Sequence, residues 1–317
     1  MKLRPLGRSG IQVAPLAFGG NVFGWTVDEP SAFRLLDTFT GNGFNLVDTA
    51  DVYSKWAPGN SGGESETVIG HWIALGGGRR EKIVLATKVG MEMPGGKKGL
   101  SREYIAQAVE DSLKRLATDV IDLYQSHWPD PATPHEETLA AYERLLKAGK
   151  VRAIGCSNFS AEQLAASLSS AREHGLPTYQ TLQPEYNLVD RASYDGPLRD
   201  LALREGLGVI TYYSLASGFL SGKYRSETDL KHSARGRGVA KYLNPRGLRI
   251  LDALDQVGGR LDAKPAEVAL AWLMQRDGVT APIASATSVE QLGSFAKAAA
   301  LVLSADDVRA LDAASAP

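Results

Sequence analysis

The chain has 317 residues, of which 44% are hydrophobic and 22% charged, and its formal net charge is −1. This composition is typical of a globular protein with a large core, and it gives no indication of nucleic acid or a membrane as a partner. The one cysteine, Cys156, excludes an internal disulfide and fits a cytoplasmic location, which we expect. The start, MKLRPLGRSG, lacks the apolar core of a signal peptide, and no stretch approaches the roughly 20 apolar residues of a membrane helix.

Strand-like and helix-like segments alternate along the chain. An N-terminal hairpin is predicted with its turn between Gly7 and Gly10. Short apolar runs then predict eight strands, at 16–19, 45–48, 83–88, 120–127, 151–157, 181–185, 209–214 and 280–283. Helical patterns between them predict helices at 29–41, 64–75, 101–117 and 135–148, another that begins at Ser160, and a C-terminal helix after Ala296.

Eight strands that alternate with helices over this length match an α/β fold, a (β/α)8 TIM barrel of about 250 residues plus insertions. A doubly wound sheet is the competitor, but no G-x-G-x-x-G follows a strand. We therefore expect residues 1–317 to form one barrel domain, with the hairpin at its N-terminus. Long loops are predicted at the C-terminal rim, at 54–63, 89–99 and 214–247, and the last of these is rich in basic residues.

Four ionisable residues lie just past different apolar runs: Asp48, Tyr53, Lys88 and His127. The C-terminal ends of parallel strands in a closed sheet meet at one rim, so we expect these side chains to converge there. Singly, each is more often a structural or surface residue. Together they form a set in which Lys88, anchored by Asp48, lowers the pKa of the Tyr53 phenol, and His127 hydrogen-bonds the reacting oxygen. Such a set moves one proton on or off a carbonyl or alcohol oxygen, with no obvious acyl-transfer nucleophile and no metal cluster.

Several motifs resemble those of the aldo-keto reductase family, in the family's order, over about residues 2–295. They lie at 45–53 (NLVDTADVY), 87–90 (TKVG), 125–127 (QSH), 147–159 (KAGKVRAIGCSNF), 182–187 (LQPEYN), 213–215 (YSL) and 218–223 (GFLSGK). The chain is similar to bacterial members of the branch that includes the reductases resembling potassium-channel beta subunits. The resemblance implies hydride transfer without a metal from a nicotinamide cofactor to an aldehyde or ketone. It makes Tyr53 the general acid, Lys88 and Asp48 the groups that tune it, and His127 the residue that orients the substrate oxygen.

The resemblance also implies a cofactor site. Ser157, Asn158 and Gln183 match positions that hold the nicotinamide carboxamide, and Tyr213 matches an aromatic residue that stacks on the ring. The segment from Ser214 to Lys223 matches the backbone that wraps the pyrophosphate. The complete set expected to bind the cofactor is Ser157, Asn158, Gln183, Tyr213, Ser214, Leu215, Ser217, Gly218, Leu220, Gly222, Lys223, Ser285, Thr287 and Gln291.

The segment expected to meet the adenosine end departs from the family pattern. Ser285 and Thr287 stand where a cation for the 2′-phosphate is common, and Ser294-Phe295 replaces a Glu-Asn pair. A 2′-phosphate is usually met by arginine or lysine. We expect NADP(H), with Arg235 or Arg237 of the long loop supplying the charge, and NAD(H) stays open as the alternative.

Aromatic residues in the loops predict the substrate pocket. Phe23, Trp25, Trp56 and Trp128 would favour apolar or aromatic carbonyl compounds over phosphorylated sugars, although at least one ring is expected to pack against a loop. Two other functions stay open: a cofactor-binding regulatory or sensor protein with little turnover, and a Schiff-base lyase with Lys88 as nucleophile. The sequence gives no indication of the oligomeric state.

Overall fold

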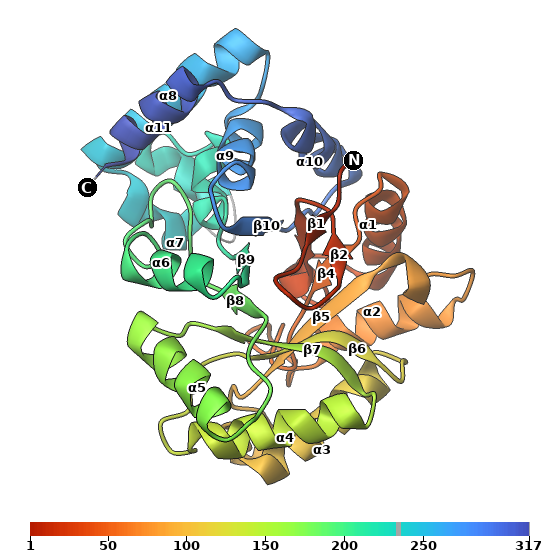
Figure 1. Ribbon diagram of the computed structural model, residues 1–317. Helices are drawn as coiled ribbons and strands as arrows, with labels where there is room; N and C mark the ends of the chain where they lie inside the picture. Colours follow the sequence, from red (N-terminus) through yellow and green to blue (C-terminus); the bar gives the residue numbers. More distant parts are fainter. Residues whose placement is uncertain (233–235, 317) are drawn as a thin grey trace.

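The computed structural model describes residues 1–232 and 236–316 (Figure 1). Eight parallel strands close into a barrel in the order β10-β3-β4-β5-β6-β7-β8-β9. Their bounds are β3 (Ala17–Gly19), β4 (Leu46–Asp48), β5 (Val84–Val89), β6 (Ile121–Ser126), β7 (Val151–Ser157), β8 (Thr181–Gln183), β9 (Gly208–Thr211) and β10 (Val279–Ala284). The predicted (β/α)8 TIM barrel with an N-terminal hairpin is confirmed.

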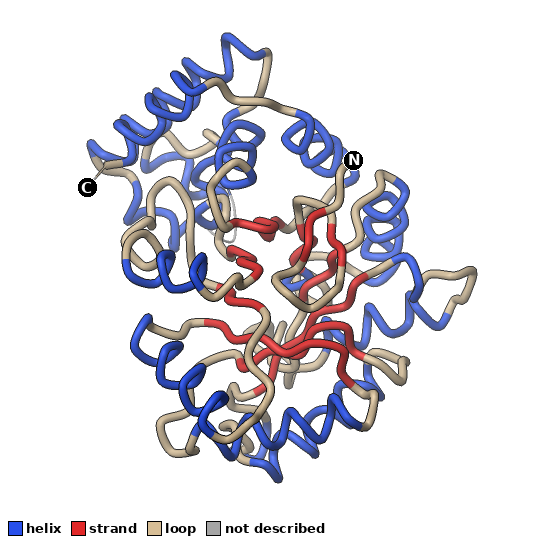
Figure 2. The backbone as a smooth tube through the Cα atoms, viewed as in Figure 1, coloured by secondary structure: helices blue, strands red, loops and turns tan. Residues whose placement is uncertain are grey.

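Helices surround the barrel on its outer side, with the strands at the centre (Figure 2). In chain order they are α1 (Glu29–Gly41), α2 (Glu64–Ala74), α3 (Arg102–Arg115), α4 (His135–Lys147), α5 (Ala161–Glu173), α6 (Pro197–Arg204), α7 (Gly236–Val239), α8 (Pro245–Leu261), α9 (Pro265–Met274), α10 (Val289–Ala300) and α11 (Ala305–Ser315). Hydroxyl side chains cap several of them, as expected for Ser101 before α3 and Ser160 before α5. No helix among residues 1–232 and 236–316 has the length and apolar composition required to cross a membrane.

Two strands end two or more residues earlier than the sequence predicts, and the local backbone explains both. β8 ends at Gln183 because the next residue, Pro184, has no N–H to donate to a ladder. β9 ends at Thr211, two residues before Tyr213, whose φ of 51° lies in the left-handed region. The predicted loop 214–247 is partly helical: it contains short 3-10 turns, α7 and the first residues of α8.

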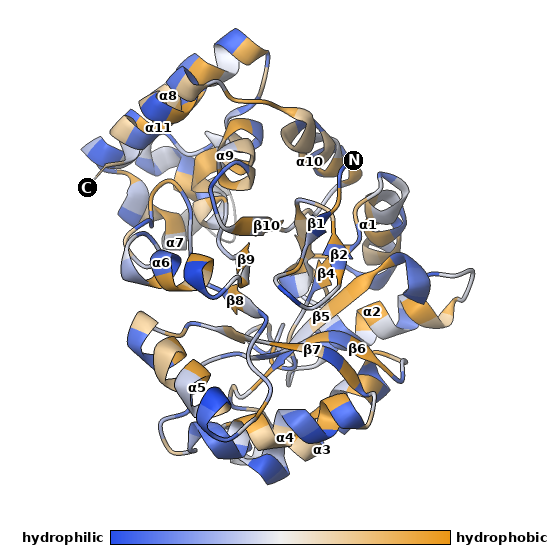
Figure 3. Ribbon diagram, viewed as in Figure 1, coloured by the Kyte–Doolittle hydropathy of each residue, from blue (hydrophilic) through white to orange (hydrophobic). Residues whose placement is uncertain are grey.

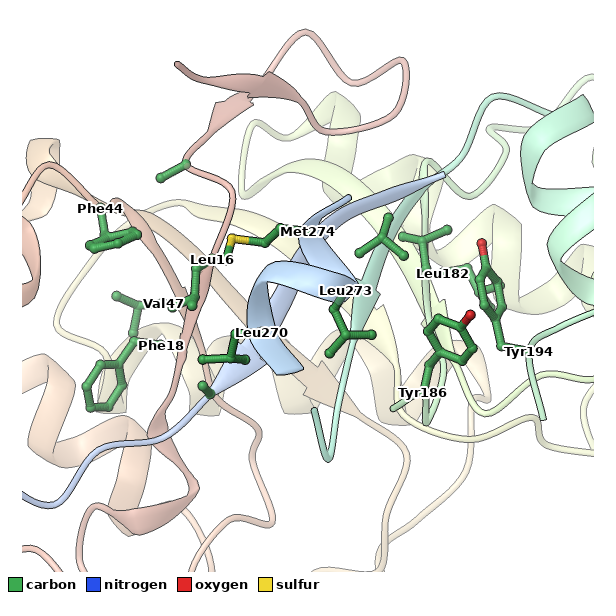
Figure 4. Packing of buried hydrophobic residues seen from close by; sticks show 14 of the residues in the cluster. Leu16, Phe18, Phe44, Val47, Leu182, Tyr186, Tyr194, Leu270, Leu273 and Met274 are labelled. Carbon is green, nitrogen blue, oxygen red and sulfur yellow. The ribbon is translucent and has the colours of Figure 1, made fainter. Parts of the chain in front are cut away.

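The core has two parts, one inside the barrel and one between the barrel and its helices. The outer part joins the outward faces of the strands to the apolar faces of the helices, which are hydrophilic on their other side (Figure 3). Helix α9 is the exception, because every residue from Glu267 to Met274 is buried, as expected for a helix enclosed on all sides. Figure 4 shows its Leu270, Leu273 and Met274 within this outer cluster.

The hairpin formed by β1 (Arg4–Pro5) and β2 (Gln12–Val13) contributes to the inner part of the core. Its Leu6, Ile11 and Val13 are buried in one cluster with the inward-facing side chains of the strands. Gly7 permits the close approach of the hairpin, since its φ is 58° and a Cβ there would lie 2.1 Å from the carbonyl oxygen of Gln180. The hairpin thus packs against the interior of the barrel.

Candidate active site

Four ionisable side chains lie at the C-terminal ends of neighbouring strands. Asp48 is the last residue of β4, Lys88 lies near the end of β5, and His127 follows β6 directly. Alternate residues of a strand face the same side, so Asp48 and Lys88 face the barrel interior with Leu46 and Ala86, which belong to the inner core. Tyr53 reaches the same place from the turn after β4. The structure therefore brings together the four residues expected to converge.

The Lys88 amine connects Asp48 to Tyr53. Its Nζ donates hydrogen bonds to Asp48 Oδ2 at 2.7 Å, to the carbonyl oxygen of Thr49 at 2.8 Å and to Tyr53 Oη at 2.9 Å. The second carboxylate oxygen, Asp48 Oδ1, accepts from Gln183 Nε2 at 2.9 Å. Asp48 and Lys88 are both buried, so each charge is compensated by its partner in a site removed from water. This arrangement fixes the position of the Tyr53 hydroxyl.

The environment keeps the Tyr53 hydroxyl protonated. Loss of solvation raises the pKa of Tyr53 well above its ordinary value, and the nearby Asp48 carboxylate raises it further. Burial also lowers the pKa of Lys88, against the opposing effect of Asp48. In the protein alone the pKa of the phenol is raised, because burial and the Asp48 carboxylate both act in that direction; that Lys88 lowers it stays a prediction. A protonated phenol is the form that can donate a proton.

His127 is held as a neutral imidazole. Burial and the nearby Lys88 charge lower its pKa well below the ordinary value. Its Nδ1 is buried and has no hydrogen-bond partner among the described residues, while the residue lines the cavity beside Tyr53, at 6.0 Å between ring centroids. Buried N–H groups without a partner are rarer in folded proteins than buried acceptors without one, so we assign the proton to Nε2. His127 can then donate a hydrogen bond into the cavity.

A cavity of about 730 Å³ opens above these residues. Asp48, Tyr53 and His127 line one end of it, whereas Lys88 does not line it and is fully buried. The cavity continues past the loop after β9 to α9 and α10. Its volume lies in the range of known ligand sites, about 300–1,000 Å³. Among residues 1–232 and 236–316, no group of three or more His, Cys, Asp or Glu residues is placed to hold a metal ion.

Polar side chains from three strand ends line the middle of the cavity. Ser157 Oγ donates to the Gln183 carbonyl oxygen at 2.8 Å. Asn158 Nδ2 donates to the carbonyl oxygen of His127 at 2.8 Å, and Asn158 Oδ1 accepts from the Tyr212 hydroxyl at 2.6 Å. Tyr212 was not among the predicted site residues. The alternation of side chains along β9 could have indicated it, because Tyr212 lies two residues after the inward-facing Ile210 and so faces the same side.

The loop after β9 has an unusual backbone. Tyr213 has a φ of 51° and presents a ring that is 53% exposed, and it lines the cavity. Ala216, Ser217 and Gly218 then have φ of 47°, 57° and 96°, three consecutive residues in the left-handed region. Such conformations are unfavourable for residues other than glycine and cluster at ligand sites, where successive N–H groups can point at an anion. Lys223 closes the same segment of the cavity wall.

Most of the expected cofactor-binding residues line the cavity. These are Ser157, Asn158, Gln183, Tyr213, Ser214, Leu215, Ser217, Gly218, Lys223, Ser285, Thr287 and Gln291. Two do not line it: Leu220 is buried in the outer core, and Gly222, with φ of 79°, ends the turn beside Arg225 and Pro265. Arg235, expected at the 2′-phosphate, lies outside the described residues, as does the side chain of Arg237.

The four aromatic residues expected in the substrate pocket separate into two groups. Trp56 and Trp128 line the cavity and are each 49% exposed. Trp25 lies edge-on to Trp56, at 5.8 Å between ring centroids, and lines a neighbouring shallow pocket. Phe23 is fully buried and stacks on Phe18 at 5.2 Å, so it does not line the cavity, because this ring belongs to the core under the loop.

The far end of the cavity is formed by β10, α9 and α10. Ser285 Oγ donates to Asn21 Oδ1 at 2.6 Å, and Thr287 N donates to Gln291 Oε1 at 2.8 Å. Lys264, Ala266 and Leu270 complete this end with Glu290, Ser294 and Phe295. The contribution of α9 was not predicted, since nothing in the sequence of Lys264 and α9 indicates that they meet the segment after β10.

The donor set fits the parts of a nicotinamide dinucleotide. An exposed aromatic ring, Tyr213, lines the same cavity as Asn158 and Gln183, whose amide groups suit a carboxamide. The left-handed turn and Lys223 suit a pyrophosphate, and the buried rings and aliphatic groups at the far end suit an adenine. A side-chain or backbone group of the right chemistry is therefore present for each part.

The chain resembles known proteins over nearly its whole length. The model of the aldo/keto reductase family matches residues 15–316. "Uncharacterized oxidoreductase YrpG" of Bacillus subtilis is 37% identical over 98% of this chain and 95% of its own. "Aldo-keto reductase YhdN" of the same organism is 32% identical over 94% of this chain and 87% of its own. "Probable voltage-gated potassium channel subunit beta" of Arabidopsis thaliana is 33% identical over 94% and 91%, respectively. The chain therefore belongs to the aldo/keto reductase family of oxidoreductases.

Proposed function

We propose that this protein reduces the carbonyl group of a small aldehyde or ketone with a nicotinamide cofactor, and catalyses the reverse oxidation of the alcohol. The observation that carries the proposal is the bonding of Lys88, which holds the Tyr53 hydroxyl at 2.9 Å while Asp48 holds the amine at 2.7 Å. This set lies at the end of a cavity whose remaining wall suits a dinucleotide.

The reaction divides into a hydride transfer and a proton transfer. When bound, the nicotinamide supplies the hydride that is added to the carbonyl carbon. Tyr53 donates its proton to the carbonyl oxygen, and the resulting phenolate is stabilised by the Lys88 ammonium until solvent returns the proton. His127 donates a hydrogen bond from Nε2 to the same oxygen and so orients the carbonyl and stabilises the charge that develops there. Asp48 keeps Lys88 charged and in place.

The substrate pocket favours apolar or aromatic carbonyl compounds. Trp56 and Trp128 offer half-exposed rings in the cavity wall, and the ring centroids of Tyr53 and Trp56 are 6.0 Å apart. The described cationic residues that line the cavity, Lys223 and Lys264, belong to the loop after β9 and to the start of α9, away from the tetrad. A phosphorylated substrate would therefore find little compensation for its charge there.

A regulatory or sensor function is the second candidate. Relatives named as probable potassium channel subunits favour it. The complete set of four bonded residues favours turnover, because a sensor requires only the binding of the cofactor. A Schiff-base lyase is the weaker alternative, since Lys88 is fully buried, donates three hydrogen bonds and does not line the cavity.

The test is absorbance at the reduced-nicotinamide band, with NADPH or NADH and a panel of aromatic and aliphatic carbonyl compounds. Tyr53→Phe is expected to lower kcat by about 10²–10⁴-fold, the usual contribution of a general acid, while cofactor binding stays within about twofold. Tight binding of a cofactor without turnover over the whole panel would refute the reductase and favour the sensor. Full activity in Tyr53→Phe would refute the assignment of the proton donor.

A further inference from the structure

The far end of the cavity has a charged pair of its own. Lys264 stands immediately before α9, and Glu290 lies in the first turn of α10. Lys264 Nζ and Glu290 Oε1 are 3.7 Å apart, and their side chains are 64% and 86% exposed. Both residues line the cavity together with Ser294 and Phe295, in the part where the resemblance places the adenosine.

Among the described residues, Lys264 is the positively charged side chain at this end of the cavity. Among residues 1–232 and 236–316, the lysine and arginine side chains that line the cavity are Lys223 and Lys264. Lys223 belongs to the loop that suits the pyrophosphate, with its Nζ 5.0 Å from the centre of the Tyr224 ring. The positions where the family commonly has a cation, after β10, hold Ser285 and Thr287, which carry no charge.

The two members of the pair have opposite effects on a 2′-phosphate. An exposed ion pair is weak, and a phosphate monoester carries nearly two charges and three acceptor oxygens, so it competes well with Glu290 for Lys264. Glu290 then lies close to a dianion and repels it. A 2′-hydroxyl reverses the balance, because a carboxylate can accept its hydrogen bond, as acidic residues do in sites for NAD.

We propose that Lys264 and Glu290 together set the cofactor preference of this protein, with Lys264 binding the 2′-phosphate of NADPH and Glu290 opposing it and accepting from the ribose hydroxyl of NADH. This inference rests on the proposed function, since it assigns the adenosine end of the same cavity. It locates the cation of the pair before α9 instead of after β10. It also gives a modest preference for NADPH, because the two charges oppose each other.

The test is calorimetric titration with NADPH, NADH and two fragments that carry the adenosine end, 2′,5′-ADP and ADP. Lys264→Gln is expected to weaken the binding of NADPH and 2′,5′-ADP by about tenfold, because one charge-assisted hydrogen bond is lost. The affinities for NADH and ADP should stay within about twofold of the wild type. Glu290→Gln is expected to raise the affinity for NADPH by about threefold, because it removes a negative charge that repels the dianionic phosphate. Circular dichroism checks that each variant is folded.

Lys297→Gln is the matched control. Lys297 lies on α10 and does not line the cavity, and its Nζ is 3.6 Å from Glu267 Oε2. Lys297→Gln therefore removes a positive charge from the same region of the protein but not from the cavity. All four ligands should then bind as in the wild type. The affinity of the wild type for NADPH should also fall more steeply with salt than that for NADH, and Lys264→Gln should abolish this difference.

The outcomes separate this inference from the proposed function. If the wild type binds both dinucleotides and Lys264→Gln leaves their affinity ratio unchanged, or Lys297→Gln changes it equally, the inference is wrong and the reductase stands. If the wild type binds neither dinucleotide, the proposed function fails and the inference fails with it. Selective loss of NADPH and 2′,5′-ADP in Lys264→Gln alone supports the inference.

Discussion

At the scale of single residues, two buried carboxyl groups near the site, Asp48 and Asp51, differ in whether neighbouring groups compensate their charge. Asp48 has partners on both carboxylate oxygens, whereas Asp51, three residues later, is buried and has no side-chain hydrogen bond from any described residue. Burial raises the pKa of Asp51 well above its ordinary value, and Glu66 adds to this effect. Glu66 itself is bonded by Thr87 at 2.6 Å and by Arg115 at 2.7 Å. Asp51 therefore resists ionisation.

Asp51→Asn is expected to gain stability relative to the wild type as the pH rises. The pKa of Asp51 is higher in the folded than in the unfolded state, where it is about 3.9, so its contribution is fully present below that pH and is lost as the pH rises through the folded pKa. Asparagine does not ionise, so its contribution to the free energy of unfolding does not change with pH. The free energy of unfolding in urea, measured between pH 5 and pH 9 beside the exposed Asp119→Asn, tests this. A difference between Asp51→Asn and wild type that shrinks as the pH rises would contradict it.

At the scale of elements, the end of α8 shows how tightly the connections are packed. Asp262 ends the helix with φ of 49°, and the chain turns back so that the Ala263 N–H donates to the Gly258 carbonyl oxygen at 2.9 Å. A Cβ on Gly258 would lie 2.4 Å from the Ala263 carbonyl oxygen, whereas a Cβ on Gly259 would meet nothing within 4 Å. The two neighbouring glycines thus have different reasons to be present.

Gly258→Ala and Gly259→Ala are expected to change stability in opposite directions. Gly259→Ala should raise the free energy of unfolding by about 0.5–1 kcal/mol, because alanine is the better helix former. Gly258→Ala forces the turn to move and should lower it by about 1–3 kcal/mol, the usual cost of overpacking. Urea unfolding of both variants measures the two values. Equal effects would show that the tight turn after α8 has no influence on stability.

At the scale of the whole molecule, the residues that line the cavity and the residues of the N-terminal hairpin lie in different parts of the barrel. The mouth holds the ionisable tetrad and the cavity, and the hairpin at the N-terminus packs against the interior through Leu6, Ile11 and Val13. Barrels of this kind separate a functional rim at the C-terminal ends of the strands from parts that serve stability alone. Changes in the hairpin should therefore affect the free energy of unfolding and leave the chemistry intact.

Leu6→Ala is expected to lower the free energy of unfolding by about 2–5 kcal/mol, since it leaves a cavity at a fully buried position. Leu3→Ala, in the same segment but 43% exposed, should cost less than about 0.5 kcal/mol. Both variants should retain the kcat/KM of the wild type at 25 °C, where they stay folded. Denaturant unfolding and steady-state kinetics test this separation, which a large loss of activity in folded Leu6→Ala would disprove.

The strand pattern allowed much of the fold to be predicted. Eight apolar runs separated by helical segments gave the barrel and the hairpin correctly, because strands buried on both faces leave a continuous apolar signal. Their ends were less exact: the predicted strand 209–214 runs past the left-handed Tyr213, a conformation for which the sequence gives no signal. The secondary structure inside 214–247 was missed for a related reason, since its short turns have no periodicity.

The sequence by itself determined the architecture and the meeting of Asp48, Tyr53, Lys88 and His127, because closure of a parallel barrel brings the ends of its strands to one rim. The tertiary structure decided what depends on packing between distant segments. It buried Phe23 against Phe18 and placed Lys264 beside Glu290. It also raised the pKa of Tyr53 instead of lowering it. Burial and the approach of residues far apart in the chain are collective properties of the folded molecule, and no local pattern of residues contains them.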